Sequence, residues 1–449
     1  MEDRRATSER LLGEDILVER VPMRRIAAAV LIGTSIEWYD FLIYSTAAAL
    51  VFGQLFFPTF DPVAGTLASF ATFAVGFLAR PFGGILFGHF GDKLGRKGML
   101  VLSLTMMGLA TFIVGLLPTY ESIGVAAPII LVLMRLIQGL GVGGEWGGAV
   151  LTAVEHSSPE KRGLYGSLPQ MGVPAGLMLS TLAFLAVARL PNEQFLAWGW
   201  RLPFLISIVL VAIGLYIRLK INESPVFRRV QETRAEVRMP LVEVVRTHPR
   251  QILLATGSII STGTYFYVVY TYAINYGTET GGLGRSGMLL ALILSSIVAI
   301  IALPLFGALS ERVGRKPLIL VGLAGMGLWI FPVFWLIDTG VLLWVILGYI
   351  LGVILFSVSY GPQATFIAEL FTTKVRFSGS STSFQIGVML GGALAPLISA
   401  SLVAATGTSL SVSFYVAAMS LISFISVILV TQTELAEGSR DMSESEVDN

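Results

Sequence analysis

The sequence predicts an all-α membrane protein of twelve transmembrane helices arranged as two six-helix bundles. Three observations predict this fold class. Of the 449 residues, 54% are hydrophobic and only 13% are charged, so a water-soluble fold would leave too much apolar surface exposed. Long apolar runs recur along the whole chain, and one charged loop sequence occurs twice. An internal duplication of this kind is typical of membrane carriers built from two halves.

Twelve apolar runs are long enough to span a bilayer, because crossing ~30 Å of hydrocarbon needs roughly 20 helical residues. We expect them to start near Ile26, Pro62, Gly98, Ala127, Gly163, Ala197, Gln251, Gly284, Pro317, Val341, Phe377 and Ser409. The repeated loops, Gly88–Lys97 and Gly307–Lys316, follow the second and the eighth run. Both carry glycine, an acidic residue followed by a basic one, and Gly-Arg-Lys in matching places. The repeat therefore predicts a six-helix unit used twice.

The positions of lysine and arginine predict that both chain ends are cytoplasmic. With that orientation, all but five of the 30 Lys and Arg residues lie in cytoplasmic loops and ends, as the positive-inside rule requires. The predicted parts are a cytoplasmic N-terminal segment (1–24), an N-terminal six-helix bundle (25–221), a cytoplasmic linker (222–250), a C-terminal six-helix bundle (251–431) and an acidic cytoplasmic tail (432–449). The linker could instead be an amphipathic helix on the membrane surface.

Motifs and composition argue against several other classes of protein. No Gly-x-x-x-x-Gly-Lys-Ser/Thr loop occurs in the sequence, which disfavours an ATP-driven pump. No cysteine is present to act as a nucleophile or a metal ligand, and His89, His156 and His248 are too widely separated for a metal site. We therefore expect no enzymatic activity, no metal and no cofactor, with a proton gradient as the driving force.

Several motifs carry a family resemblance. Besides the repeated loop, they are Ile36-Glu-Trp-Tyr-Asp-Phe41, Ala79-Arg-Pro-Phe-Gly-Gly84, Arg135-Leu-Ile-Gln-Gly-Leu-Gly-Val-Gly-Gly-Glu145, Trp198-Gly-Trp-Arg201 and Glu223-Ser-Pro225. The loop resembles the signature of the major facilitator superfamily, and the motifs together resemble its metabolite:proton symporters, which carry shikimate, oxoglutarate, citrate, or proline and betaine. Asn192-Glu-Gln-Phe195 is most similar to shikimate-type members. The resemblance covers nearly the whole chain and implies the major facilitator fold.

Ionisable residues inside the predicted spans are the first candidates for function, because a charge near the bilayer centre is costly. Helix rise places five of them at similar depth in the N-terminal bundle: Glu37, Asp40, Arg80, Arg135 and Glu145. A carboxylate whose arginine moves away takes up a proton. The resemblance implies that Asp40 carries the proton with Arg135 as its switching partner, and Glu37 shares a helix face with Asp40. The alternative is a permanent buried charge network that holds the bundle together.

Arg80 is the candidate anchor for a substrate carboxylate, since its planar fork can form two parallel hydrogen bonds with an organic anion. A salt bridge to Glu37 or Glu145 is the alternative. The C-terminal half has no ionisable residue in the middle of a predicted span, so its hydroxyl and amide groups would select substrate shape. The other candidate substrate-binding residues are Tyr265, Gln385, Gln170 and Tyr360. Membrane tyrosines also serve as packing and interface anchors.

The repeated loops are candidate gates at the cytoplasmic surface. Each copy has an acidic residue that can cap a helix start and an arginine that can pair with a carboxylate at a neighbouring helix end. The resemblance implies that this loop ties the two halves together on the inside and favours the outward-open state. The alternative is that its basic residues only set topology. The candidate gate residues are Gly88, Asp92, Arg96, Glu155, Arg162, Glu311, Arg315, Glu369 and Arg376.

Together these features predict a secondary active transporter that moves a small organic acid, shikimate-like or dicarboxylate-like, with protons into the cytoplasm by alternating access. The expected location is the plasma (inner) membrane. The expected partners are the small-molecule substrate, protons and the lipid bilayer, without nucleic acid or an obligate protein partner. The alternatives are a proline/betaine-type zwitterion symporter or a passive uniporter and, from a different class, a transporter-like metabolite sensor.

Overall fold

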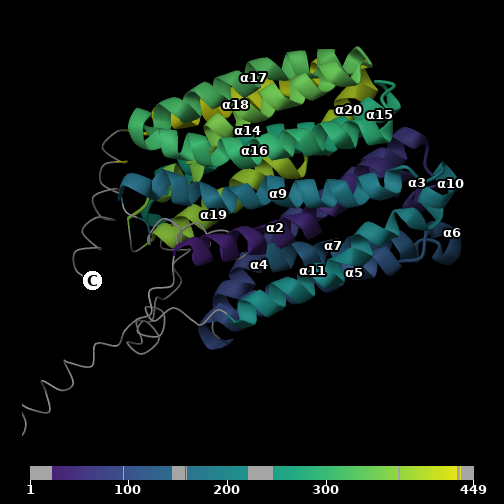
Figure 1. Ribbon diagram of the computed structural model, residues 1–449, viewed down its shortest axis with the longest axis horizontal. Coiled ribbons are helices and arrows are strands. Elements are labelled where there is room, and N and C mark those ends of the chain that lie inside the picture. The colour runs from purple at the N-terminus through teal and green to yellow at the C-terminus, as the bar shows by residue number, and fades with distance from the viewer. Residues whose placement is uncertain are drawn as a thin grey trace, which may run out of the picture.

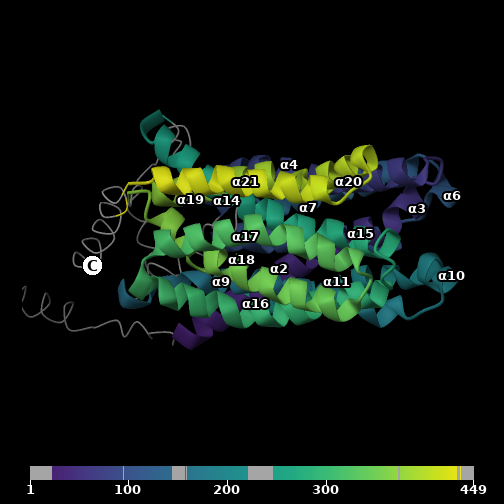
Figure 2. The same ribbon diagram turned by 90° about the horizontal axis from the view of Figure 1, so that it is seen from above.

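The structure of the protein is a computed structural model that describes residues 23–94, 96–143, 157, 159–220, 246–372, 375–431 and 435. These residues form helices and connecting turns, with no β-strand among them. The helices run side by side in one elongated bundle, and the start of α2 (Met23–Ala47) and the end of α21 (Leu410–Leu429) lie at the same end of it (Figure 1, Figure 2). We call this the terminus end and the opposite one the far end.

The N-terminal half begins with α2 and closes with α11. Asp61 helps to start its second span, because its Oδ1 accepts hydrogen bonds of 3.1 Å from the N–H groups of Val63 and Ala64. The elements of this half after α2 are the π-helical turn η1 (Ala48–Phe52), α3 (Gly53–Phe56), α4 (Pro62–Leu94), α5 (Arg96–Leu116), α6 (Tyr120–Ile123), α7 (Ala126–Val142), the 3₁₀ turn η2 (Pro159–Lys161), α9 (Arg162–Ala188), α10 (Asn192–Gln194), the π-helical turn η3 (Phe195–Gly199) and α11 (Arg201–Lys220).

The C-terminal half follows residue 245 and ends with α21. Gly314, from the second copy of the repeated loop, separates two of its long helices with a φ of +94°, a conformation that favours glycine. The elements before α21 are α14 (Pro249–Tyr267), the π-helical turn η4 (Val268–Tyr272), α15 (Ala273–Glu279), α16 (Arg285–Val313), α17 (Arg315–Asp338), α18 (Leu342–Ala368), α19 (Arg376–Val388), the π-helical turn η5 (Met389–Ala393) and α20 (Ala395–Thr406).

The predicted membrane architecture is confirmed. Within the residues that the structure describes, ten stretches of helix are long and apolar enough to cross a membrane, and the third and fourth predicted spans are the shorter apolar helices Val101–Leu116 and Ala126–Val142. Large apolar side chains are highly exposed on the outer surface, among them Leu328 at 74%, Leu253 at 71% and Trp335 at 69%. Such a surface is stable against lipid and unstable in water. Nearly all of the predicted N-terminal segment, most of the linker and nearly all of the tail lie outside the described residues.

The two halves approach most closely where α9 and α16 lie side by side (Figure 1). A Cβ atom placed on Gly307 would come within 2.6 Å of the Gly163 carbonyl oxygen, and one placed on Gly163 would clash with the Gly307 carbonyl in turn. Glycine at both positions therefore permits this backbone-to-backbone contact.

π-helical turns interrupt the first and the seventh span at corresponding places. The interval from Ala48, which starts η1, to Val268, which starts η4, matches the interval between the repeated loops to within one residue. Carbonyl groups of these turns accept hydrogen bonds from side chains of other helices: Ser69 bonds to the Ala48 oxygen at 2.7 Å and Tyr349 to the Val269 oxygen at 3.0 Å. π-helical turns often occur at functional sites.

Candidate substrate site and gates

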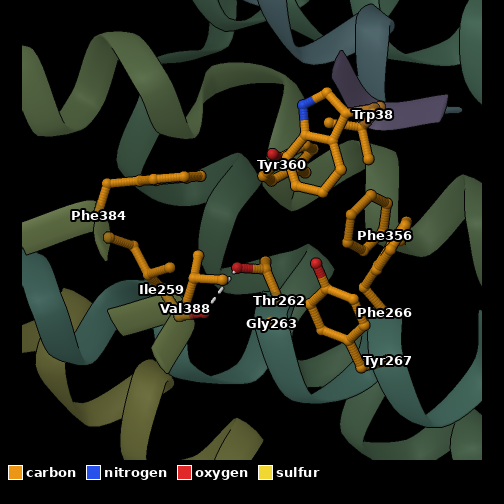
Figure 3. A pocket seen from close by; sticks show the side chains of 11 residues that line it. Trp38, Ile259, Thr262, Gly263, Phe266, Tyr267, Phe356, Tyr360, Phe384 and Val388 are labelled. Carbon is orange, nitrogen blue, oxygen red and sulfur yellow. Dashed lines mark hydrogen bonds between the residues drawn. The ribbon is translucent and has the colours of Figure 1, made fainter. Parts of the chain in front are cut away.

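A small cavity lies at the centre of the bundle, where the halves meet (Figure 3). Its volume is about 20 Å³, roughly the room that one water molecule needs. Aromatic side chains dominate its wall, and most of them come from the C-terminal half: Trp38, Phe266, Tyr267, Phe356, Tyr360 and Phe384. The structure thus shows a closed centre, and a substrate can enter only after the two halves move apart.

Arg80 lies on α4 with only 2% of its surface exposed. Its guanidinium carbon is 4.1 Å from the ring centroid of Phe41 and 4.4 Å from that of Phe77. Its Nε and Nη2 atoms are buried without a hydrogen-bond partner, and it forms no ion pair with Glu37 or with any other described carboxylate. Glu145, the other predicted partner, lies outside the described residues. Arg80 therefore keeps unused donors that can bind an anion.

The cavity wall of the C-terminal half approaches Arg80. The hydroxyl groups of Tyr267 and Tyr360 are close enough to interact with its guanidinium electrostatically, although neither satisfies Nε or Nη2. Figure 3 shows both tyrosines on the same cavity as Trp38. The Arg80 guanidinium of the N-terminal half and the tyrosine hydroxyl groups of the C-terminal half thus lie close together at the interface between the halves.

Arg135 is completely buried on α7. Its Nη1 donates a 2.9 Å hydrogen bond to Gln138 Oε1, and Gln138 Nε2 donates one of 2.8 Å to Thr111 Oγ1. The Arg135 guanidinium carbon lies 3.9 Å from the Phe41 ring centroid, the same ring that Arg80 contacts. The prediction that these two arginines lie at one depth therefore holds, and a single phenylalanine of α2 touches both.

Asp40 and Glu37 are both buried on α2, with exposed fractions of 0% and 8%. Both carboxylate oxygens of Asp40 lack a hydrogen-bond partner, and no ion pair joins Asp40 to Arg135 or Arg80. Asp40 does not line the central cavity. The structure thus does not bring together the predicted pair of Asp40 and Arg135 in this state.

Four further substrate-binding candidates occupy different positions. Tyr360 lines the central cavity, whereas Tyr265 does not; the ring of Tyr265 stacks on Phe356 at 6.4 Å, and its hydroxyl group is buried without a partner. Gln385 donates a 3.3 Å hydrogen bond to the Gly143 carbonyl across the halves. Gln170 is buried on α9. Of these four residues, only Tyr360 is a cavity residue in this closed state.

Trp38 and Tyr267 are two of the ten cavity residues that were missing from the predicted substrate site. Trp38 lies within the motif Ile36–Phe41, which carries the family resemblance, so Trp38 could have been predicted from this motif. Tyr267 is two residues from Tyr265, which turns it by roughly 200° around the helix. Depth in the membrane cannot distinguish these two tyrosines, because they differ in the direction they face.

A charged network joins the halves at the terminus end. Arg315 Nη1 forms a 3.0 Å ion pair with Glu369 Oε1, and its Nη2 lies 3.4 Å from Glu311 Oε2. The same Glu311 accepts a hydrogen bond from the backbone N–H of Gly163, at the start of α9 in the other half. Thr365 adds a 3.2 Å hydrogen bond to the Arg162 carbonyl. The predicted pairing of the loop arginine with a carboxylate at a helix end is confirmed for Arg315 and Glu369.

Glu369 is the most deeply buried carboxylate of this network, with 3% exposed. Burial raises the pKa of its carboxyl group from an ordinary 4.5 to about 7, while the nearby Arg315 guanidinium acts in the opposite direction. The carboxyl group therefore changes its charge near neutral pH. Arg376 is the first residue of α19, and its Nε donates hydrogen bonds to the Ala368 and Phe371 carbonyl groups, both at 3.2 Å.

The first copy of the repeated loop cannot be compared in the same detail. Gly88 and Asp92 lie in α4 and Arg96 begins α5, but their side chains are outside the described part of the structure, as is the whole of Glu155. Their predicted gate roles stay predictions.

The far end is closed by weaker contacts. Asn275, on α15, donates a 3.3 Å hydrogen bond to the Ala49 carbonyl in η1. Arg285, at the start of α16, donates to Asn192 Oδ1 at 3.3 Å, and its guanidinium carbon is 4.0 Å from the Phe195 ring centroid. Asn192 and Phe195 belong to the motif that resembles shikimate-type members, so the structure places this motif at the far-end closure.

Comparison with known proteins assigns the family. The family model described as Major Facilitator Superfamily matches residues 30–385. The chain belongs to the major facilitator superfamily. The transporter is 42% identical over 415 residues to the inner membrane metabolite transport protein YhjE of Escherichia coli, covering 91% of this chain and 94% of that protein. It is 40% identical over 418 residues to the shikimate transporter of the same organism, covering 92% and 95%.

A solved structure confirms the fold. The crystal structure of a D-xylose-proton symporter superposes with a TM-score of 0.70, at 19% sequence identity, covering 90% of this transporter and 96% of that chain. The chain is therefore a multi-pass membrane transporter of the metabolite symporter type and not an enzyme.

Proposed function

We propose that this transporter carries a small organic acid together with a proton into the cytoplasm by alternating access. The observation that supports this most directly is the Arg80 guanidinium, which is buried with two unpartnered nitrogen atoms. Arg80 does not itself line the central cavity, but it interacts electrostatically with Tyr267 and Tyr360, which do. Leaving buried charged donors unsatisfied is costly. A substrate carboxylate would satisfy them, so anion binding offsets a cost already present in the empty protein.

The proton site that we propose is Asp40. An ionised carboxylate that is fully buried, without a hydrogen bond or a cation beside it, is strongly disfavoured. We therefore infer that Asp40 is protonated in this closed state. When the halves move and Arg135 or water reaches Asp40, the carboxylate form becomes favourable and the proton leaves. Glu37 lies one turn away and would modulate this step through like-charge repulsion.

The sharing of Phe41 supports a link between the two sites. Asp40 and Phe41 are adjacent in α2, and the Phe41 ring touches both Arg80 and Arg135. A rearrangement of α2 that follows proton binding would move the ring on which both guanidinium groups rest. Substrate binding at Arg80 and protonation at Asp40 would then bias the same conformational equilibrium.

A zwitterionic substrate is the second candidate. The central cavity has six aromatic residues in its wall, and aromatic rings attract quaternary ammonium groups. A betaine-like molecule could place its carboxylate on Arg80 and its ammonium group against these rings. A passive uniporter would use the same groups without titration of Asp40.

Uptake into proteoliposomes tests the proposal. Shikimate, a dicarboxylate, oxoglutarate, citrate, proline and betaine are offered with and without an inward proton gradient. We expect one of the acids to accumulate only with the gradient. Asp40→Asn should abolish accumulation while exchange of internal for external substrate continues, because exchange needs no net proton transfer.

The controls separate mechanism from folding. Asp61→Asn changes an exposed carboxylate at the far end and should leave accumulation unchanged.

Arg80→Lys tests the proposed substrate anchor. It should weaken binding of an acid by about tenfold or more, because lysine cannot form two parallel hydrogen bonds with one carboxylate. Accumulation that is independent of the gradient, or equal loss of accumulation and exchange in Asp40→Asn, would contradict proton symport through Asp40.

A further inference from the structure

A second and larger cavity lies within the C-terminal half, away from the interface between the halves. Its volume is about 450 Å³, which is within the range of small-molecule sites. It lies at the far end between α17 and α21, which run side by side (Figure 2). Phe331, Phe334 and Trp335 of α17 line it together with Leu410 and Ser413 of α21.

The wall of this cavity continues onto the outer surface of the bundle. Trp335 is 69% exposed and Leu410 is 50% exposed, and both belong to helices that are apolar and long enough to cross the membrane. A tryptophan near the end of a membrane helix typically lies at the level of the lipid headgroups. The cavity is therefore open to lipid, with an apolar side suited to an acyl chain.

One wall of the cavity carries a negative charge. Asp338, the last residue of α17, accepts hydrogen bonds from the Tyr276 hydroxyl group at 2.7 Å and from the Ser409 hydroxyl group at 3.0 Å. It forms no ion pair with any described residue. A carboxylate has about four acceptor positions, so two remain for another donor. A carboxylate beside aromatic rings is a suitable environment for an ammonium group.

The start of α21 lies beside the same carboxylate. The helix begins at Leu410, which lines the cavity, and the residue before it, Ser409, donates a hydrogen bond to Asp338. The Leu410 N–H donates to Thr408 Oγ1, and the Val412 N–H donates to the Ser409 carbonyl. Asp338 therefore lies at the positive end of the helix dipole, and the cavity presents a carboxylate acceptor for a cationic group.

We propose that this cavity binds the headgroup of an ethanolamine phospholipid from the leaflet at the far end. The ammonium group lies on Asp338, and one acyl chain lies along Trp335 and Leu410. Phosphatidylglycerol lacks the ammonium group that Asp338 requires.

The same residues connect the cavity to the far-end closure. Tyr276, which donates to Asp338, belongs to α15, and its neighbour Asn275 donates to Ala49 of the other half. The ring centroids of Phe334 and Tyr276 are 5.5 Å apart. Lipid bound at Asp338 therefore touches the anchor of the helix that closes the far end, so that lipid composition acts on the opening of that end.

Lipid retention by the purified full-length protein tests the proposal. The protein is incubated with equal amounts of phosphatidylethanolamine and phosphatidylglycerol of identical acyl chains, and the retained lipid is counted by native mass spectrometry. We expect about tenfold preference for phosphatidylethanolamine, since a charge-assisted hydrogen bond is lost with the glycerol headgroup. Asp338→Asn should abolish the preference. Glu279→Gln, which removes an exposed charge outside the cavity at the same end, should retain it.

A second variant tests the apolar wall independently of Asp338. Trp335→Ala changes a side chain that is mostly exposed, so the fold is expected to tolerate it, and retention of both lipids should fall about threefold or more with the lost apolar contact. Equal retention of the two lipids by the unaltered protein would overturn the proposal. So would a preference that survives in Asp338→Asn, or retention unaffected by Trp335→Ala.

Discussion

The two ends of the bundle are closed by different chemistry. At the terminus end, Glu311 and Glu369 engage Arg315 and the backbone of α9 within a largely buried network. At the far end, a neutral amide of Asn275 meets a carbonyl group, and Arg285 meets a neutral amide and an aromatic ring. Hydrogen bonds between charged groups are roughly twice as strong as neutral ones.

This difference indicates which end of the bundle can respond to pH. A network of charges that is buried in one state and exposed in the other changes strength with protonation, whereas neutral hydrogen bonds do not. The terminus end is therefore the end whose closure can follow pH. The far end depends on one neutral hydrogen bond and on Arg285, whose hydrogen-bond and ring partners are uncharged, so these contacts do not change with protonation near neutral pH.

The largest effect is expected from Gly307→Val, which adds a side chain where α9 and α16 touch. The new Cβ would lie within 2.6 Å of the Gly163 carbonyl oxygen, so the helices must separate and the terminus end cannot close. We expect substrate uptake into proteoliposomes to fall by at least about tenfold, because overpacking of this kind costs about 2 kcal/mol.

Gly284→Val is the matched control for this substitution. Its Cβ would have no neighbour within 4 Å, and its φ of −65° suits any residue. Uptake by this variant should remain at the level of the unaltered protein. Normal uptake by Gly307→Val would show that the close contact of α9 and α16 is dispensable.

A smaller effect is expected from pH, acting through Glu369. Its pKa is raised to about 7 in this closed state, from an ordinary value of 4.5. The closed terminus end therefore binds a proton more tightly than an open one, so closure is favoured at low pH and is lost as pH rises through 7. If the exposed carboxyl group titrates at its ordinary value, the closed fraction relative to the open one falls about tenfold between pH 6 and pH 8.

Labelling of a single cysteine measures this change, because the chain has no cysteine of its own. Ser167 is fully buried against Gly307 at the interface, so Ser167→Cys should react only when the terminus end opens. Its labelling, normalised to Gly284→Cys, should rise with pH, and Glu369→Gln should remove the dependence. A pH profile unchanged by Glu369→Gln would assign the titration to another group.

The smallest effect is expected at the far end. Asn275→Ala removes one neutral hydrogen bond to the Ala49 carbonyl, which contributes about 1 kcal/mol and hence about a fivefold shift towards opening of that end. Because the two ends open alternately, labelling of Ser167→Cys should decrease. Thr278→Ala, on the same helix, removes only bonds within α15, to the Ile274 and Asn275 carbonyls, and serves as the control. Increased labelling in Asn275→Ala would contradict the assigned direction.

The fold and part of one gate could be predicted from the sequence for physical reasons. The apolar runs fix the spans, since a bilayer selects length and composition locally. The repeated loop predicted the ion pair of Arg315 with Glu369, because both lie at neighbouring helix ends within one half. The hydrogen bond from the Gly163 backbone N–H to Glu311 could not be predicted in this way, because it depends on how the two halves, which are far apart in the sequence, pack against each other.

The substrate site was harder to predict because it depends on direction as well as depth. Helix rise placed Arg80 and Arg135 correctly at one level, yet it could not separate Tyr265 from Tyr267, of which only Tyr267 lines the cavity. Nor could depth show that Asp40 lies apart from Arg135 in this state, since charge pairing depends on which conformation the halves adopt.

The position of Phe41 constrains how α2 can move. Its ring contacts one guanidinium group from α4 and another from α7, and the preceding residue is the buried Asp40. Two helices thus converge on a single turn of α2, so any rotation of that turn disturbs two cations and one acid together. If Asp40 is the proton site proposed above, a leak of protons without substrate would require this turn to move in parts, and the covalent chain between residues 40 and 41 opposes such a movement.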